Sequence, residues 1–277
     1  MRSEISATIA VVLWASLATI GASLSHLPPL LITGIGLTIG SLISLPLAKF
    51  RLRKLKVKPK TLLLGVYGLF GYHFALFAAL QTAPSVQANL VNYLWPLLIV
   101  LMSPLFLKDS KLKLKHVLAA FIGFVGAGIA ILSGQQLVAG FSPGYLFALV
   151  AAVIWATYSL GTKRVGGFDT SAIGTFGFVA GMMALIAHFL LEQSVSIQAI
   201  DWVWLLALGL GPLGGAFYFW DHALKTGNAQ RVGLISFLTP LLSTAMLLLG
   251  TGQQLSYLLL VSAALIVGAA LVGSRGE

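Results

Sequence analysis

The chain has few charged residues and no cysteine, and each shortage excludes a class of protein. Only 9% of its 277 residues are Asp, Glu, Lys or Arg, whereas 58% are hydrophobic. An ordinary soluble domain has roughly 25% charged and 45–50% apolar residues. The composition therefore predicts an integral membrane protein. Because cysteine is absent, disulfides and thiolate metal sites are excluded.

Acidic residues are scarce as well, with seven against 17 Lys and Arg. Asp221 is the only acid inside a predicted membrane span, about one turn from the span's end, where it can pair with Lys225 at i,i+4. The sequence lacks paired carboxylates, His-Glu-x-x-His and a P-loop. We therefore expect no catalytic residues, no metal, no cofactor and no ATP drive within the chain.

Long apolar runs define ten predicted membrane helices, and short connections leave no room for a soluble domain. Each run is near the ~20 residues that cross ~30 Å of hydrocarbon. The predicted spans are Ile5–Leu24, Pro28–Ala48, Thr61–Leu80, Val86–Leu107, Val117–Ser133, Pro143–Thr162, Ser171–Leu191, Trp202–Leu224, Ala229–Leu249 and Leu255–Gly273.

The basic residues orient these spans. With a cytoplasmic N-terminus, all 17 Lys and Arg fall in inner segments and none in an outer loop. This satisfies the positive-inside rule and predicts that both termini are cytoplasmic. Short basic clusters between apolar runs are typical of membrane topology. We therefore expect this chain to lie in a lipid bilayer and to bind no nucleic acid.

A duplication relates residues 1–135 to residues 136–277. Leu13-Trp-Ala-Ser16 reappears as Ile154-Trp-Ala-Thr157, and Tyr93-Leu-Trp-Pro96-Leu-Leu as Phe237-Leu-Thr-Pro240-Leu-Leu. Each unit contains five spans, and an odd number makes the second unit enter the membrane from the opposite side. The predicted fold is two five-helix repeats of inverted topology.

These features carry a family resemblance that covers essentially the whole chain. The 5+5 arrangement, the Trp-Ala within the first helix of each half, the Ala-Leu-x-Thr before the fourth helix and the mid-helix Pro resemble the EamA-type drug/metabolite transporter family. The resemblance implies a multi-pass exporter of the bacterial cytoplasmic membrane that works by alternating access. It also implies small-molecule substrates, amino acids and related metabolites, and no obligate protein partner is evident. The Arg of the second helix and the Glu after the fourth helix, which many members have, are absent here.

Polar and aromatic residues within the spans are the candidates for the transport site. Amides and indoles are costly against lipid, so they should face a cavity or other protein, and ligand cavities favour aromatic walls. Packing against lipid or neighbouring helices is the alternative for the tryptophans, and bonding to a neighbouring helix is the alternative for His73. The candidates for substrate binding are Trp14, Tyr72, His73, Asn89, Asn92, Tyr93, Trp95, Trp155, Tyr158, Phe217, Trp220 and Phe237.

Proline and glycine within the spans are the candidates for bending and gating. Proline removes one helical hydrogen bond, and glycine weakens a helix. The candidates are Pro96, Pro240, Gly68, Gly71, Pro212 and Gly214. The sequence thus predicts a secondary transporter that exports aromatic and other largely neutral amino acids. An exporter of other metabolites or cationic drugs is the alternative within the class, and a membrane enzyme is the alternative outside it.

Overall fold

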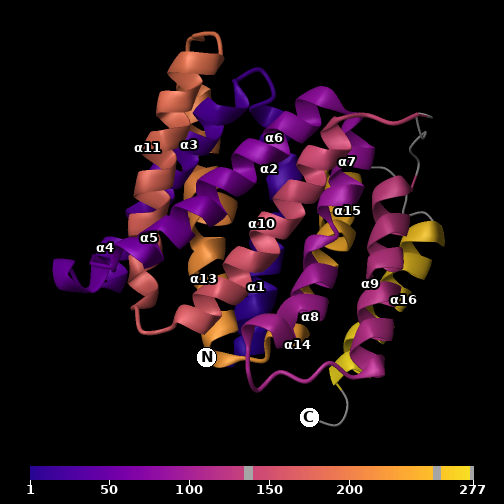
Figure 1. Cartoon of the computed structure of the whole chain (residues 1–277). Coiled ribbons are helices and arrows are strands. Elements are labelled where there is room, and N and C mark those ends of the chain that lie inside the picture. The colour runs from indigo at the N-terminus through magenta and orange to yellow at the C-terminus, as the bar shows by residue number, and fades with distance from the viewer. Residues whose placement is uncertain (134–139, 252–256, 275–277) are drawn as a thin grey trace.

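The structure is a computed structural model that describes residues 1–133, 140–251 and 257–274, and every regular element in these ranges is a helix. The helices lie side by side as one bundle (Figure 1). The first half contains α1 (Ser3–Ala15), α2 (Leu17–Ser23), α3 (Pro29–Ser41), α4 (Ser44–Leu47), η1 (Leu52–Leu55), α5 (Pro59–Val66), η2 (Tyr67–Gly71), α6 (Tyr72–Thr82), α7 (Ser85–Asn92), α8 (Trp95–Phe106) and α9 (Leu114–Leu132). The second contains α10 (Gly144–Val165), η3 (Thr170–Ala172), α11 (Ile173–Leu191), α12 (Ala199–Leu210), η4 (Gly211–Gly215), α13 (Ala216–Thr226), α14 (Ala229–Ser236), α15 (Leu238–Thr251) and α16 (Tyr257–Ser274).

The predicted all-helical membrane fold is confirmed for the described part of the chain. Eight helical segments, counted with their short interruptions, are long and apolar enough to cross a membrane. They correspond to the first eight predicted spans, from Ser3–Ser23 to Ala199–Thr226. The ninth predicted span corresponds to α14 and α15, and the tenth to α16, whose apolar stretch Tyr257–Gly273 is shorter.

Several spans are interrupted near their middle, and the interruptions fall beside the predicted prolines and glycines. The fourth span divides between α7 and α8, with Pro96 in the first turn of α8, where a missing N–H leaves no hydrogen bond unmade. The ninth divides at Phe237, three residues before Pro240. The third and eighth spans each contain a π-helical turn, η2 and η4, a feature often found at functional sites.

Helix α3 approaches η4 closely enough to require glycine on both sides. A Cβ atom at Gly40 would lie 2.6 Å from the Gly214 Cα atom and 2.8 Å from the Gly209 carbonyl oxygen. The Tyr218 hydroxyl also donates a hydrogen bond to the Gly40 carbonyl oxygen at 3.0 Å. Gly40 therefore lets α3 pack closely against η4.

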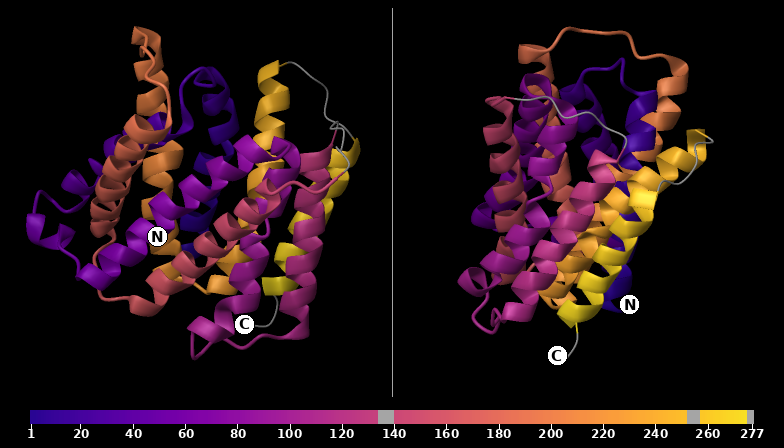
Figure 2. Two further views of the ribbon diagram at one scale, coloured as in Figure 1. Left: turned by 45° about the horizontal axis from the view of Figure 1, so that its top comes forward. Right: turned by 90° about the vertical axis from the view of Figure 1, so that its right-hand side faces the viewer.

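At the end of the bundle where α1 begins and α16 ends (Figure 2), polar contacts tie several helices together. Arg231 pairs with Glu4 at 2.9 Å, and Lys54 pairs with Asp169 at 3.2 Å. Lys163 donates from Nζ to the Leu224 and Gly227 carbonyl oxygens at 2.6 and 2.7 Å. Helices α1, α10, α13 and α14 are therefore joined at this end.

The opposite end carries acid–histidine pairs instead. His26 Nε2 lies 3.1 Å from Asp201, and His188 Nδ1 lies 2.9 Å from Glu192. Glu192 also accepts the Leu30 and Leu31 N–H groups at the start of α3. A carboxylate at a helix N-terminus is favourable because it meets unpaired N–H groups and the positive end of the helix dipole.

Candidate functional site

A cavity of about 600 Å³, open solvent at its mouth included, lies between helices of both halves. Its deepest wall is aromatic, and its lining extends away from the end where α1 begins. The lining residues are Trp14, Leu17, Tyr72, His73, Leu76, Asn89, Asn92, Tyr93, Trp95, Trp155, Leu213, Phe217 and Thr239.

Nine of the twelve candidate binding residues line this cavity. The other four lining residues were absent from the candidates. Thr239 had a sequence signal, because it is a polar residue directly before Pro240 in the repeated motif. Leu17, Leu76 and Leu213 had none, since an apolar residue in an apolar span is equally suited to lipid, core and cavity.

Tyr158 and Trp220 lie just beyond the cavity, and Phe237 lies elsewhere. The break at Phe237 directs that side chain toward α9, where a Cβ at Gly123 would lie 2.6 Å from the Phe237 ring. Phe237 is fully buried in a second core cluster with Val100 and Leu234. The structure thus separates Phe237 from Tyr93, its counterpart in the duplication, which lines the cavity.

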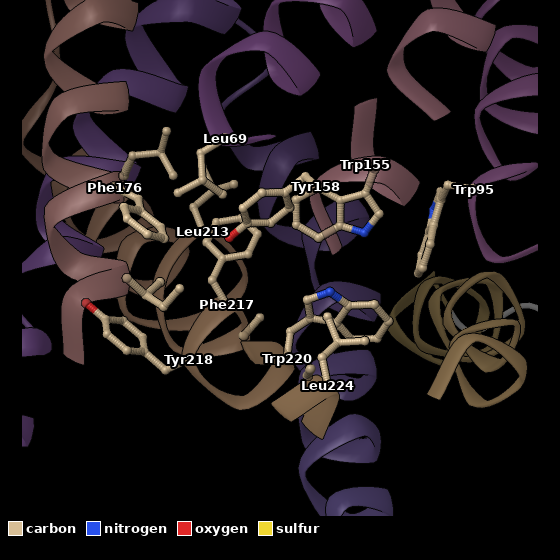
Figure 3. Close-up of a cluster of buried hydrophobic side chains, with 14 of the residues drawn as sticks. Leu69, Trp95, Trp155, Tyr158, Phe176, Leu213, Phe217, Tyr218, Trp220 and Leu224 are labelled. Atoms are coloured by element: carbon tan, nitrogen blue, oxygen red, sulfur yellow. The ribbon is translucent and has the colours of Figure 1, made fainter. Parts of the chain in front are cut away.

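Three tryptophans at the floor of the cavity, Trp14, Trp95 and Trp155, meet a fourth, Trp220, just beneath it. The centroid of the Trp14 ring lies 5.1 Å from that of Trp220, 5.6 Å from Trp155 and 6.1 Å from Trp95. Figure 3 shows the ring of Trp155 from α10 above that of Trp220 from α13, with Trp95 of α8 to one side. The Trp155 and Trp220 rings are nearly parallel, with centroids 6.5 Å apart. Trp220 donates from Nε1 to the Ser159 hydroxyl at 3.0 Å. Edge-to-face and offset rings attract beyond their burial, so the floor is an ordered aromatic layer.

Neutral polar groups occupy one wall of the cavity. Asn92 donates from Nδ2 to the Tyr72 hydroxyl at 3.2 Å, while its buried Oδ1 has no hydrogen-bond partner among the described residues. His73 Nδ1 lies 2.6 Å from the Leu69 carbonyl oxygen. That oxygen only accepts, so Nδ1 carries the proton, and Nε2 of a neutral ring is left as an acceptor. The wall thus offers two acceptors without a carboxylate.

The candidate gating residues lie around this site. Gly68 packs directly under the Tyr158 ring, whereas a Cβ at Gly71 would meet only Ile154, at 3.7 Å. Pro212 and Gly214 belong to η4, which is buried against α3. Pro96 and Pro240 follow the two helix breaks described above, and Thr239 places one of these breaks at the cavity wall.

Known proteins are similar to this chain in sequence and in fold over most of its length. The chain is 38% identical over 283 residues to an aromatic amino acid exporter YddG from Ancylobacter novellus, and the match covers 98% of both proteins. A protein of the same description from Escherichia coli is 28% identical over 77% of each chain. A solved crystal structure agrees with a TM-score of 0.91 at 36% identity, over 98% of this chain and 97% of that one.

A family model also matches the chain, in two segments. The segments are residues 1–132 and 142–275, and the model describes the EamA-like transporter family. With its membrane-spanning helices and these relatives, the protein is a multi-pass protein of the bacterial cytoplasmic membrane. The chain belongs to the EamA-like transporter family, as the resemblance in its sequence predicted.

Proposed function

We propose that the protein exports aromatic and other largely neutral amino acids. The observation that carries this proposal is a cavity with an aromatic floor and neutral polar walls. Trp14, Trp95, Trp155 and Phe217 suit aromatic and aliphatic side chains, because such surfaces gain from apolar burial and ring contacts. Relatives described as aromatic amino acid exporters support the same conclusion.

Neutral groups are proposed to hold the zwitterionic end of the substrate. The unpaired Asn92 Oδ1 and the His73 Nε2 lone pair suit an ammonium group, which only donates hydrogen bonds. Tyr72 receives a hydrogen bond from Asn92, so its own O–H is available to a carboxylate. Asn89 and Tyr93 line the same cavity and add further donors.

The proposed mechanism is alternating access by two inverted repeats with ten spans in all, both termini cytoplasmic. Two separate family matches and the paired interruptions η2/η4 and α7–α8/α14–α15 support the duplication. The cavity extends away from the end that holds the start of α1, and polar contacts join the helices at that end. We therefore assign this conformation to the outward-open state.

The alternatives differ in how well they account for the site. Export of other metabolites or of cationic drugs uses the same aromatic walls, and the neutral acceptors favour cations over anions. A membrane enzyme would need reactive groups gathered at one depth, and the transporter family favours transport. We expect facilitated diffusion or exchange rather than proton coupling, because His73 is the only titratable nitrogen that lines the cavity among the described residues.

Transport by the purified protein in liposomes tests the proposal. Labelled tryptophan, phenylalanine and leucine should equilibrate across the membrane at rates above protein-free liposomes. Trp14→Ala should slow all three, since it removes the ring that contacts Trp95, Trp155, Phe217 and Trp220. If the protein in liposomes transports only strongly anionic solutes, such as sugar phosphates, the proposal is refuted.

A further inference from the structure

A buried acid lies one helical turn below the cavity floor, on the same face of α13. Phe217 lines the cavity, and Asp221 and Lys225 follow at i,i+4 steps, so these three side chains form one line from the cavity toward the joined end of the bundle. Asp221 is only 3% exposed. A buried carboxylate is costly unless it is paired and hydrogen-bonded, so its partners define what this site can do.

The two carboxylate oxygens of Asp221 differ in their hydrogen bonding. Oδ2 pairs with Lys225 Nζ at 2.7 Å and accepts a hydrogen bond from the Thr170 hydroxyl at 2.7 Å. Oδ1 is buried and has no hydrogen-bond partner in the part of the chain that the structure describes. Buried polar atoms are usually satisfied, and an exception calls for an explanation. Here it is an unoccupied acceptor on the only described acid that lies directly below the cavity.

Lys225 has partners that do not depend on Asp221. Its Nζ donates to the Phe168 carbonyl oxygen at 3.0 Å and lies 3.5 Å from the centre of the Phe168 ring. A cation over an aromatic face is stabilised by the ring's negative quadrupole. Lys225 can therefore give up the carboxylate without being left unpaired, and its side chain is 18% exposed toward water.

The matching positions of the first half carry no charge. The motif Ala79-Leu-Gln-Thr-Ala83 corresponds to Ala223-Leu-Lys-Thr-Gly227, which places Gln81 opposite Lys225 and Phe77 opposite Asp221. Phe77 and Gln81 line a second hollow of about 400 Å³, open solvent included. The acid–lysine pair is thus a property of one end of the molecule.

From these contacts we infer that Asp221 is an entry subsite for a primary ammonium group on the cytoplasmic side. This inference rests on the proposed function and adds how the substrate opens the gate. While the cytoplasmic end is closed, the Lys225 ammonium is paired with the Asp221 carboxylate. An arriving amino acid has the same chemical group, an alkyl ammonium, and replaces Lys225 at this carboxylate. The ammonium also takes the place of the Thr170 hydroxyl at the carboxylate, so one of the two ties between α13 and the segment 168–170 is released while Lys225 stays with Phe168. A carboxylate without an amino group does not release it.

Cysteine labelling tests the exchange, because the chain contains no cysteine of its own. Thr162 is 2% exposed on α10, and its hydroxyl donates a hydrogen bond to the Ser159 carbonyl oxygen of the same helix. A Thr162→Cys reporter in inside-out vesicles should react slowly with an impermeant maleimide. Tryptophan and tryptamine should raise that rate about 5-fold or more, the lower end of ordinary coupling between sites. Indole-3-propionate, which has no ammonium, should leave the rate unchanged.

Three variants decide whether Asp221 is the group involved. Asp221→Asn in the reporter should abolish the response to tryptophan and tryptamine, whereas Asp109→Asn, an exposed acid between α8 and α9 at the same end, should retain it. Lys225→Gln removes the competitor and should lower the tryptophan concentration for half-maximal labelling, which provides a test if Asp221→Asn fails to insert. An unchanged half-maximal concentration in Lys225→Gln, or a full response to indole-3-propionate in the reporter, would overturn the inference.

Transport of tryptophan in liposomes separates this inference from the proposed function. If tryptophan is transported but the labelling rate responds equally to solutes with and without an ammonium group, the entry subsite is refuted and the export proposal stands. Ammonium-dependent labelling without any amino-acid flux would refute the proposed substrate and leave the subsite standing. Asp221→Asn should reduce tryptophan flux more than Asp109→Asn does.

Discussion

The contact between α3 and η4 predicts a large difference between two neighbouring glycines. In Gly40→Ala, the new methyl group would lie 2.6 Å from the Gly214 Cα atom, against the ~3.5–4.0 Å of an ordinary carbon contact. The helices would have to separate by roughly 1 Å, because the atoms in the way are backbone. Overpacking costs about 1–3 kcal/mol, and separation would also strain the Tyr218–Gly40 hydrogen bond, worth about 1 kcal/mol. The expected loss of unfolding free energy is about 2–4 kcal/mol.

Gly36→Ala in the same helix is the matched control. Its methyl group would meet the tip of the Leu213 side chain at 2.7 Å, and a leucine tip can rotate away. Its cost should stay below about 1.5 kcal/mol, offset in part by the higher helix propensity of alanine. Unfolding in mixed micelles with increasing dodecyl sulfate measures both. If Gly40→Ala and Gly36→Ala unfold at the same detergent fraction, the close approach of α3 and η4 does not limit stability.

Four further substitutions test the gates, the driving force and one charged contact. Pro96→Ala and Pro240→Ala should shift labelling of a Tyr93→Cys reporter in opposite directions, since each restores a helix in a different half; equal shifts would exclude mirrored gates. His73→Gln should leave transport insensitive to an imposed pH gradient, as in the unmodified chain, and strong gradient-driven uptake lost in this variant would refute facilitated transport. Partial burial opposes ionisation of Asp169, but hydrogen bonds from Ser171 and the nearby Lys54 outweigh it and lower the pKa of that carboxyl below 3.8. Its stabilising effect is thus present above pH 3.8 and lost as the pH falls through the lower folded pKa, so thermal melts should show Asp169→Asn losing less stability on acidification than the unmodified chain.

The sequence predicted the interruptions because their causes are local. A proline lacks its N–H group wherever it stands, and glycines weaken a helix through backbone entropy. Pro96, Pro212 and Gly214 therefore marked irregular segments before any packing was known. The aromatic floor followed for a similar reason, since Trp14 and Trp155 occupy matching places in the duplicated motif.

Side-chain direction could not be predicted in the same way. Phe237 occupies the position of Tyr93 in the duplication, yet the helix break turns it toward Gly123 and into a separate cluster. That choice depends on which neighbouring helix leaves room, which is a tertiary property. The pairing of Asp221 with Lys225 was predicted from i,i+4 spacing, but the contacts with Thr170 and Phe168 join distant segments and required the structure.

The four tryptophans at the cavity floor give the protein an optical signature of its own. Four of the six indoles in the chain belong to this group, which consists of Trp14, Trp95, Trp155 and Trp220. The centroid of the Trp14 ring lies 5.1 Å from that of Trp220, 5.6 Å from Trp155 and 6.1 Å from Trp95. Indoles this close couple electronically, so near-ultraviolet circular dichroism will be dominated by their mutual orientation. Phenylalanine and leucine do not absorb at indole wavelengths. Their binding is therefore observable as a change in the native spectrum, without a label.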